Sequence, residues 1–336
     1  MRETRDRTGG SARLCAVAVV ALAFLVAGCG GPENSLHAHS HQERSISQLW
    51  WWMMTAAWIG FGLIVFLLAL GWVRRRSEGL PFRGGDRAAN ILIVTLGIAV
   101  PMVLLSGLFV WSDIFVLKTV AAPNPRSTRM SVHVVGRQWF WDVRYPGTSA
   151  LTANEIHIPV RTRVDLIATT GDVAHSFWVP ALNRKIDMYP GRVNRILLYA
   201  DRVGTYRGSC SEFCGLQHAH MGMLVIAQTP GAFRAWLARQ ERPAAASSGD
   251  GERIFQRDCS NCHQIRGAAA DARVGPDLTH VASRRTLAAL AIDNTRADLA
   301  RWIRDPQGVK PGNLMPATRL SNAQLNALVS YLETLK

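Results

Sequence analysis

Two long apolar runs in the first third of this 336-residue chain limit most strongly what it can fold into. Trp50 to Val73 is 24 residues long and Ile91 to Trp111 is 21 residues long, and neither run contains a charged residue. A helix of about 20 apolar residues crosses the hydrocarbon core of a bilayer. The sequence therefore predicts a two-helix transmembrane hairpin within residues 50–118, and a buried helical pair in a soluble core is the alternative.

The positions of the arginines orient this hairpin. Arg74-Arg75-Arg76 and Arg83 lie in the short loop between the two runs, and basic residues favour the cytoplasmic side. Trp50-Trp51-Trp52 suits the headgroup level, where aromatic residues gather. We therefore expect the regions before and after the hairpin to face outward. A net charge of +14 could indicate nucleic-acid binding, but the basic residues are scattered, so we expect no nucleic-acid partner.

Residues 1–28 have the pattern of a secretory signal, in which four arginines precede the apolar stretch from Leu14 to Val26. The stretch ends in Val26-Ala27-Gly28-Cys29, which resembles a bacterial lipoprotein cleavage box. We expect a mature chain that begins at Cys29 with a lipid on its sulfur, and an unmodified Cys29 is the alternative. In the tail of residues 29–49, His37, His39 and His41 either bind a metal or belong to a solvated linker.

Beyond residue 119 the apolar pattern becomes that of strands separated by turns. Ser131 to Val135, Glu155 to Ile158 and Arg163 to Ile167 show alternation, and Tyr189-Pro-Gly191 is one of the turn signals between strands. Many short strands predict a small β-sandwich or barrel over residues 119–238.

The last third of the chain is predicted to be helical. Residues 239–250 are rich in Ala, Ser and Gly and predict a flexible linker. Helical apolar spacing follows within residues 251–336, at Leu287 to Ala291, Asp298 to Ile303 and Asn322 to Leu335, the last helix being capped by Ser321.

The densest group of metal-binding residue types is Cys210, Cys214, His218 and Met221, with His175 upstream. Thiolates, imidazoles and a thioether form a soft donor set that suits copper. A single copper needs one cysteine, whereas two thiolates four residues apart can bridge two copper ions. A shared electron then changes each bond length little, which favours fast electron transfer. A Cys210–Cys214 disulfide and a zinc site are the alternatives.

Cys259-Ser-Asn-Cys262-His263 is the attachment motif of a c-type haem. Both thiols would form thioethers to the porphyrin, and His263 would bind the iron. Met315, in Gly312-Asn-Leu-Met315-Pro, is the expected second axial ligand, and Met/His ligation raises the haem potential. His280 is the alternative axial ligand, and a Cys259–Cys262 disulfide is the alternative for the thiols.

The chain from Trp50 to Gln228 resembles the cytochrome c oxidase subunit II family, and Gly249 to Lys336 resembles class I cytochromes c. The resemblance implies a membrane-anchored multidomain protein, with a cupredoxin-like β-barrel and an all-α cytochrome c domain. It implies that two bridging thiolates, two imidazoles and two weak axial donors hold a binuclear copper centre: Cys210 and Cys214, His175 and His218, Met221 and the backbone carbonyl of Glu212. His220 is then a bystander.

The resemblance also implies roles for three residues outside the two metal sites. Gly136-Arg-Gln-Trp-Phe-Trp141 matches the family's aromatic stretch, in which Trp139 takes the place of the exposed tryptophan through which electrons enter. Asn183 to Arg192 resembles the segment that docks on the catalytic subunit, where Asp187 and Arg192 would link the copper site to haem and water. A core aromatic and surface ion pairs are the respective alternatives.

One departure from the family concerns proton uptake. The family usually carries a glutamate near the start of the second span, but Ile91 to Pro101 contains no acidic residue, and Asp86 is the nearest one upstream. The resemblance therefore leaves a contribution of this subunit to proton uptake in doubt.

The expected function is to pass electrons through haem c and the copper pair to a catalytic subunit I, which reduces oxygen to water and translocates protons. Subunit III and a donor, either cytochrome c or an upstream complex, are the other expected partners. The expected place is the bacterial inner membrane, with both metal domains on the periplasmic side. The alternatives are the equivalent subunit of a copper-containing nitric oxide reductase, a stand-alone membrane-tethered electron carrier, and a copper-delivery or sensing protein. A quinol oxidase is disfavoured, because that branch lacks the copper ligands.

Charge adds a hypothesis about recruitment of the donor. Residues 120–240 contain 14 Lys and Arg against 7 Asp and Glu, so a basic soluble donor would be repelled. A tethered haem domain makes electron transfer intramolecular, at a local concentration of about a millimolar for a short linker. We therefore expect the tether to replace electrostatic recruitment.

Overall fold

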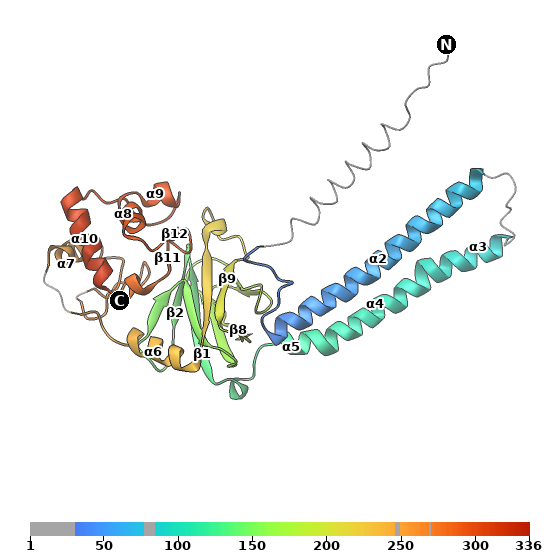
Figure 1. Cartoon of the computed structure of the whole chain (residues 1–336), viewed down its shortest axis with the longest axis horizontal. Helices are drawn as coiled ribbons and strands as arrows, with labels where there is room; N and C mark the ends of the chain where they lie inside the picture. The colour runs from blue at the N-terminus through green and yellow to red at the C-terminus, as the bar shows by residue number, and fades with distance from the viewer. Residues whose placement is uncertain (1–30, 77–84, 246–248, 269) are drawn as a thin grey trace, which may run out of the picture.

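The computed structural model describes residues 31–76, 85–245, 249–268 and 270–336. The predicted signal, Cys29 and Arg83 lie outside these residues. Figure 1 shows a helical hairpin, a central β domain and a C-terminal helical domain in succession along the molecule.

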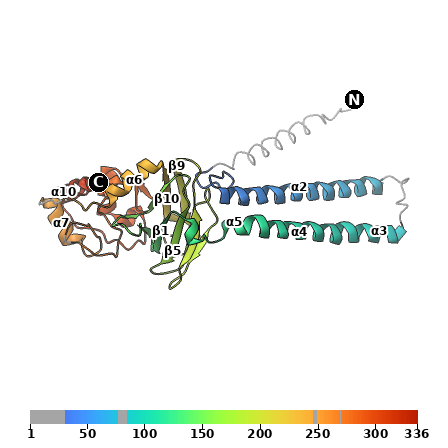
Figure 2. The ribbon, with the colours of Figure 1, turned by 90° about the horizontal axis from the view of Figure 1, so that it is seen from below.

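The hairpin consists of two long antiparallel helices that lie side by side in both views (Figures 1 and 2). The first is α2 (His41–Arg76). The second comprises α3 (Gly85–Val94), α4 (Val100–Trp111) and α5 (Lys118–Val120), which are joined by π-helical turns at Thr95–Ala99 and Ser112–Leu117.

Both helices have the length and composition to cross a membrane, over His41–Arg74 and Arg87–Val120, and their most apolar windows are not buried within the protein. Apolar side chains this exposed need a lipid or protein environment. The prediction of two membrane-type helices is therefore confirmed, and the alternative of a buried pair in a soluble core is wrong.

The β domain contains two five-stranded sheets within the described residues. Their strand orders are β3-β2-β1-β5-β8 and β4-β10-β9-β6-β7, with parallel pairing only in β1–β5 and β4–β10. The strands are β1 (Met130–Arg137), β2 (Phe140–Arg144), β3 (Leu151–Ala153), β4 (Glu155–Pro159), β5 (Val164–Thr170), β6 (His175–Trp178), β7 (Ile186–Met188), β8 (Asn194–Leu198), β9 (Gly204–Cys210) and β10 (Gly222–Gln228).

Alternating burial along the strands explains why this sequence forms a layered β domain. In β1, Val132 and Val134 are fully buried, while the residues between them are partly exposed. Trp141 and Phe177 are buried in the same core. The predicted sandwich or barrel is therefore confirmed. Helix α6 (Pro230–Gln240) closes the domain with Trp236, whose ring stacks on that of His157.

The C-terminal domain has four helices in the described residues: α7 (Asp250–Asp258), α8 (Arg296–Arg304), α9 (Pro306–Val309) and α10 (Asn322–Thr334). Ser321 caps α10 in a reciprocal capping box with Gln324, as the sequence predicts. Phe255 and Leu328 are fully buried in its core. A two-stranded ribbon of β11 (Thr286–Leu287) and β12 (Ile292–Asp293) is an addition to the expected all-α domain.

The predicted helix at Leu287 to Ala291 is wrong. Strand β11 ends at Leu287, and the next three residues are left-handed, with φ of 52° at Ala288, 58° at Ala289 and 70° at Leu290. The apolar spacing misled the prediction because these residues form a turn rather than a helix, and the Ala289 carbonyl of this turn bonds the β domain.

The C-terminal domain is docked on the β domain. The amide of Arg285 donates to Glu155 Oε1 at 2.6 Å, and its guanidinium donates to Thr205 Oγ1 at 2.6 Å. The amide of Gly222 donates to the carbonyl oxygen of Ala289 at 3.2 Å. These contacts fix the two domains together through residues that are 130, 80 and 67 positions apart in sequence.

The described part of the linker is packed as well, which differs from the flexible linker expected. Helix α6 continues to Gln240. The Arg266 guanidinium donates to the carbonyls of Gln240, Glu241 and Arg242, and the amide of Ala244 donates to the Arg266 carbonyl at 2.7 Å.

Candidate functional site

The two cysteines and two histidines of the predicted copper site lie together at one end of the β domain. His175 begins β6 and Cys210 ends β9, so adjacent strands deliver one imidazole and one thiol. Cys210 Sγ and Cys214 Sγ are 3.8 Å apart. His175 Nδ1 lies 3.8 Å from Cys210 Sγ, and His218 Nδ1 lies 3.7 Å from Cys214 Sγ. Each imidazole therefore presents its Nδ1 to a different sulfur.

The two predicted weak donors flank the same sulfurs. Met221 Sδ lies 3.9 Å from Cys214 Sγ, and the carbonyl oxygen of Glu212 lies 3.3 Å from Cys210 Sγ. Met221 is fully buried and directly precedes β10, at the end of the loop of residues 211–221, called the copper loop below. All six predicted donors are thus within one cluster.

Both thiols are free, and their separation is far beyond a disulfide S–S bond of about 2.05 Å. The hydrogen bond from Cys214 lowers the pKa of Cys210 to about 3, and the same bond raises the pKa of Cys214. Two thiolates this close repel each other unless cations bind between them. With two imidazoles and a thioether beside them, the residues fit a pair of soft copper ions.

Asp172 contacts the imidazole nitrogen of His175 that points away from the sulfurs. His175 is fully buried, and its Nε2 lies 2.9 Å from Asp172 Oδ1. Burial alone would raise the pKa of Asp172, but hydrogen bonds from His175 and from the amides of Gln138 and Val173 outweigh it and lower that pKa. A carboxylate on Nε2 leaves Nδ1 to face the sulfurs, as outer partners of metal-binding histidines do.

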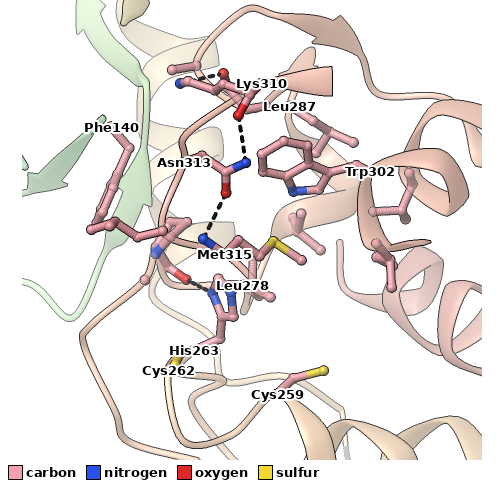
Figure 3. A pocket seen from close by; sticks show the side chains of 18 of the residues that line it. Phe140, Cys259, Cys262, His263, Leu278, Leu287, Trp302, Lys310, Asn313 and Met315 are labelled. Atoms are coloured by element: carbon pink, nitrogen blue, oxygen red, sulfur yellow. Dashed lines mark hydrogen bonds between the residues drawn. The ribbon is translucent and has the colours of Figure 1, made fainter. Parts of the chain in front are cut away.

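The c-type haem motif lies in a cavity of the C-terminal domain. Cys259, Cys262, His263 and Met315 all line it (Figure 3). His263 Nδ1 donates to the carbonyl oxygen of Pro276 at 2.8 Å, so Nε2 is the nitrogen available to a metal. Burial lowers the pKa of His263, which keeps the imidazole neutral and able to bind.

The surroundings of this cavity fit a flat ligand against His263. A Cβ at Gly275 would lie 2.6 Å from His263 Cε1, so glycine permits this close approach of backbone to ring. The amide of Met315 donates to Asn313 Oδ1 at 2.7 Å, which orients the methionine loop. His280, the alternative ligand, does not line the cavity: its ring bonds the carbonyls of Lys336 and Arg242.

Trp139 lies between the two sites. Its Nε1 donates to the carbonyl oxygen of Cys214 at 3.0 Å, and its side chain lines the same cavity as Cys262 and Met315. The resemblance implied an exposed tryptophan, yet Trp139 is only 8% exposed in this chain. The C-terminal domain covers it, and Phe140 extends from β2 towards the cavity (Figure 3).

The predicted docking residues are not brought together as a pair. Asp187 in β7 forms an ion pair with Lys185 Nζ at 3.0 Å, and this hydrogen bond is the main cause of its lowered pKa. The amide of Arg192 donates to the Tyr189 carbonyl in the following turn. Asp187 is still close to the copper site, because its strand partner Ser176 follows His175.

The remaining histidines are placed outside the two sites. His220 Nδ1 lies 2.8 Å from Gln217 Oε1, consistent with a bystander. In the tail, the backbone of His39 bonds Ala181 and Asp201 of the β domain. Among the described residues, the only group of three or more histidine, cysteine or acidic residues with metal spacing is His175, Cys210 and Cys214, so the tail tract forms no such group.

Sequence reasoning missed two polar residues that hold the sites in place. Asp172 carries a usable signal, because it precedes His175 by three residues in a Thr-Gly-Asp turn. Lys310, which is 3% exposed between the domains, carries none, since its role depends on the docking of distant segments.

Comparisons with known proteins identify the families of both metal-site domains. Residues 149–228 match the family described as "Cytochrome C oxidase subunit II, periplasmic domain", and residues 248–336 match the family described as "Cytochrome c". The cytochrome c oxidase subunit 2 of Alkalihalophilus pseudofirmus is 34% identical over 289 residues, which cover 81% of this chain and 81% of that protein. The cytochrome c oxidase subunit 2 of Bacillus sp. strain PS3 is 31% identical over 264 residues, covering 73% and 72%.

Among solved structures, the periplasmic domain of subunit II of cytochrome oxidase from Bradyrhizobium japonicum is 28% identical. The superposed residues make up 35% of this chain and 95% of the solved domain, and the TM-score is 0.32.

Proposed function

Because the chain belongs to the cytochrome c oxidase subunit II family, we propose that it is the subunit through which electrons enter a proton-translocating respiratory oxidase. It would carry one covalent haem c and a binuclear copper centre. The observation that carries this proposal is the position of Trp139, which lines the haem cavity and donates to the Cys214 carbonyl.

When bound, the haem and the copper pair supply the two redox positions between which an electron moves, without bond making or breaking. The residues of the copper site serve this step by staying in place. Cys210 is held at the end of β9, and His175 is held by Asp172, so a change of charge moves the ligands little. The indole of Trp139 lies between the sites, since it lines the haem cavity and donates to the Cys214 carbonyl.

In the haem domain, Cys259 and Cys262 would attach the porphyrin, while His263 and Met315 would bind the iron. A buried neutral His263 and a thioether favour a relatively high haem potential, which suits a cofactor that must itself be reduced by an upstream donor.

The proposal includes partners and a location. The family implies a catalytic subunit I, in whose membrane domain the two long helices of this chain would pack, and a subunit III. Asp187 and Arg192 would face subunit I near the copper site. We place the protein in the bacterial inner membrane, with both metal domains on the periplasmic side and cytochrome c or an upstream complex as donor.

Metal analysis of the full-length chain, matured with haem and reconstituted with copper, tests this proposal. We expect two coppers and one haem iron per chain, and a mixed-valence copper spectrum that Cys214→Ser abolishes. Met223→Leu is the matched control, since Met223 is as buried as Met221 but has no predicted role as a ligand. A folded chain that keeps a Cys210–Cys214 disulfide and binds no copper would contradict the proposal.

Purification from the native membrane separates this function from that of a stand-alone carrier. We expect a complex that contains a second chain with additional haem, and the sequence of that chain distinguishes an oxygen-reducing partner from one that reduces nitric oxide.

A further inference from the structure

A buried lysine joins the two metal domains. Lys310 follows α9, and its Nζ donates to the carbonyl oxygen of Trp139 at 3.0 Å and to that of Ala288 at 3.1 Å. The first carbonyl belongs to the β domain and the second to the haem domain. One ammonium group therefore bridges the domain interface at the peptide that carries the central tryptophan.

The backbone of the same lysine leads to the predicted methionine ligand. Asn313 Nδ2 donates to the Lys310 carbonyl at 2.7 Å, and Asn313 Oδ1 accepts from the amide of Met315 at 2.7 Å. Figure 3 shows these two bonds in line between Lys310 and Met315. A shift of Lys310 would thus displace Asn313 and the loop that carries Met315.

On the other side of the interface, the bonds continue to the copper loop. Trp139 Nε1 and Gln138 Nε2 both donate to the carbonyl oxygen of Cys214, at 3.0 Å and 2.7 Å. Hydrogen bonds therefore run from the Met315 loop through Lys310 to the Trp139 peptide, and from its side chain to Cys214.

The second carbonyl held by Lys310 belongs to the left-handed turn of residues 288–290. Left-handed backbone is disfavoured for residues other than glycine and persists only where contacts hold it. Ala289 accepts from the amide of Gly222, and a Cβ at Gly222 would lie 2.8 Å from Leu290 Cδ1. Gly222 directly follows Met221, so this turn contacts the residue next to a predicted copper ligand.

Burying an ammonium group is unfavourable, which makes its presence here informative. Burial lowers the pKa of Lys310 to about 8, and none of the ion pairs among the described residues includes it. If position 310 served only to fill space, a methionine side chain would pack there equally well. What lysine adds is a donor for the buried Trp139 carbonyl and the partly buried Ala288 carbonyl.

We propose that Lys310 is a positioning residue, which fixes the haem domain on the copper domain and keeps Trp139 between the two cofactors. This inference rests on the proposed function. It adds that the rate of electron transfer within the chain depends on an interdomain hydrogen-bonding residue that ligates neither metal.

Hydrogen exchange tests the positioning without reference to activity. The amides of Arg285 and Gly222 donate across the interface and report docking directly. In full-length Lys310→Met we expect both amides to exchange at least about tenfold faster, because the Trp139 and Ala288 carbonyls lose their donor. The β1–β5 ladder should be unchanged. Lys310→Arg should keep most of the protection, and Lys336→Met, at an exposed lysine, should keep all of it.

Electron transfer is then measured in the same variants, loaded with haem and copper, after rapid reduction of the haem. We expect the rate from reduced haem to oxidised copper to fall at least about tenfold in Lys310→Met, because small displacements of reacting groups have large effects on rate. Lys310→Arg should restore most of it. If Lys310→Met fails to incorporate haem, Lys310→Gln, with a shorter polar end, replaces it with the same expectation.

The possible outcomes separate this inference from the proposed function. If the unaltered chain passes no electron from haem to copper, the proposed function fails. If the unaltered chain does so, and Lys310→Met has unchanged exchange and rate, only the role of Lys310 is overturned. The role of Lys310 is also overturned if amide exchange is unchanged and the loss of rate is fully explained by a shift in the midpoint potential of the haem or of the copper pair.

Discussion

At the scale of single residues, the sequence indicated the candidate donors, whereas it did not indicate Lys310, which joins the two domains. Cys210, Cys214 and His218 stand close together in the chain, and their chemistry alone indicates copper. Lys310 acts through contacts with residues far away in the chain, whereas Asp172 lies only three residues before His175. No local pattern marks a residue such as Lys310, because any surface lysine looks the same in sequence.

The contact between Asp172 and His175 predicts a defect in copper affinity. Asp172→Asn keeps the size of the side chain but removes the charge that accepts from His175 Nε2. We expect copper affinity to fall by about 10-fold or more, as it does when outer partners of metal ligands are lost. Competition with a copper chelator measures it, and Asp165→Asn, whose carboxylate pairs with Arg195 instead, is the control. Equal affinity in both variants would contradict this role.

The buried Lys310 predicts how docking depends on pH. Its pKa is about 8 when docked, against its ordinary value of 10.5 when exposed. Between these two values the undocked domain binds more protons, so raising the pH favours docking; below about pH 8 the full cost of burying the charge applies. Exchange of the Arg285 amide, corrected for its intrinsic pH dependence, should slow from pH 8 to 10. Lys310→Arg should show no such trend, since arginine stays charged.

At the scale of elements, the sequence predicted most helices and strands because their signals are local. Ser321 marks the start of α10, and the alternation of apolar and polar residues predicts β1. The failure was at residues 288–290, where apolar spacing suggested a helix but the chain forms a left-handed turn held by the other domain. Tertiary contacts override helix propensity when they bind the backbone itself.

This left-handed turn predicts an unusual glycine effect. Ala288→Gly should raise the unfolding free energy of the haem domain by about 1 kcal/mol, because glycine adopts positive φ without steric cost. Ala300→Gly, in the middle of α8, should lower it by about 0.5–1 kcal/mol. Denaturant unfolding of the full chain, followed by haem absorbance, measures both. Destabilisation by both substitutions would contradict the assigned backbone strain.

At the scale of the whole molecule, the order of hairpin, β domain and haem domain was predictable, but the docking of the last two was not. The sequence suggested a haem domain on a flexible tether. Instead, Arg266 binds the described part of the linker, and Arg285 binds the β domain. Interfaces between domains consist of contacts without sequence periodicity, so composition could only suggest a linker.

Cutting the linker tests how much the tether contributes beyond docking. A protease site inserted after Ala245 allows cleavage of the folded, loaded protein. We expect the rate from haem to copper to become dependent on protein concentration, and to fall at micromolar dilution, since the tether supplies about millimolar local concentration. The uncut insertion variant is the control. A rate that is the same at every dilution would show that the interface alone keeps the domains together.

The short tail ahead of α2 has a consequence for assembly. Glu33 pairs with Arg207, the backbone of His39 bonds Ala181 and Asp201, and Ser40 donates to Leu182 just before the helix begins. The orientation of the β domain relative to helix α2 is therefore set within this polypeptide. A catalytic subunit would therefore bind a surface that is already oriented. Less rotational freedom would be lost on binding than if the β domain were loosely hinged to the helices.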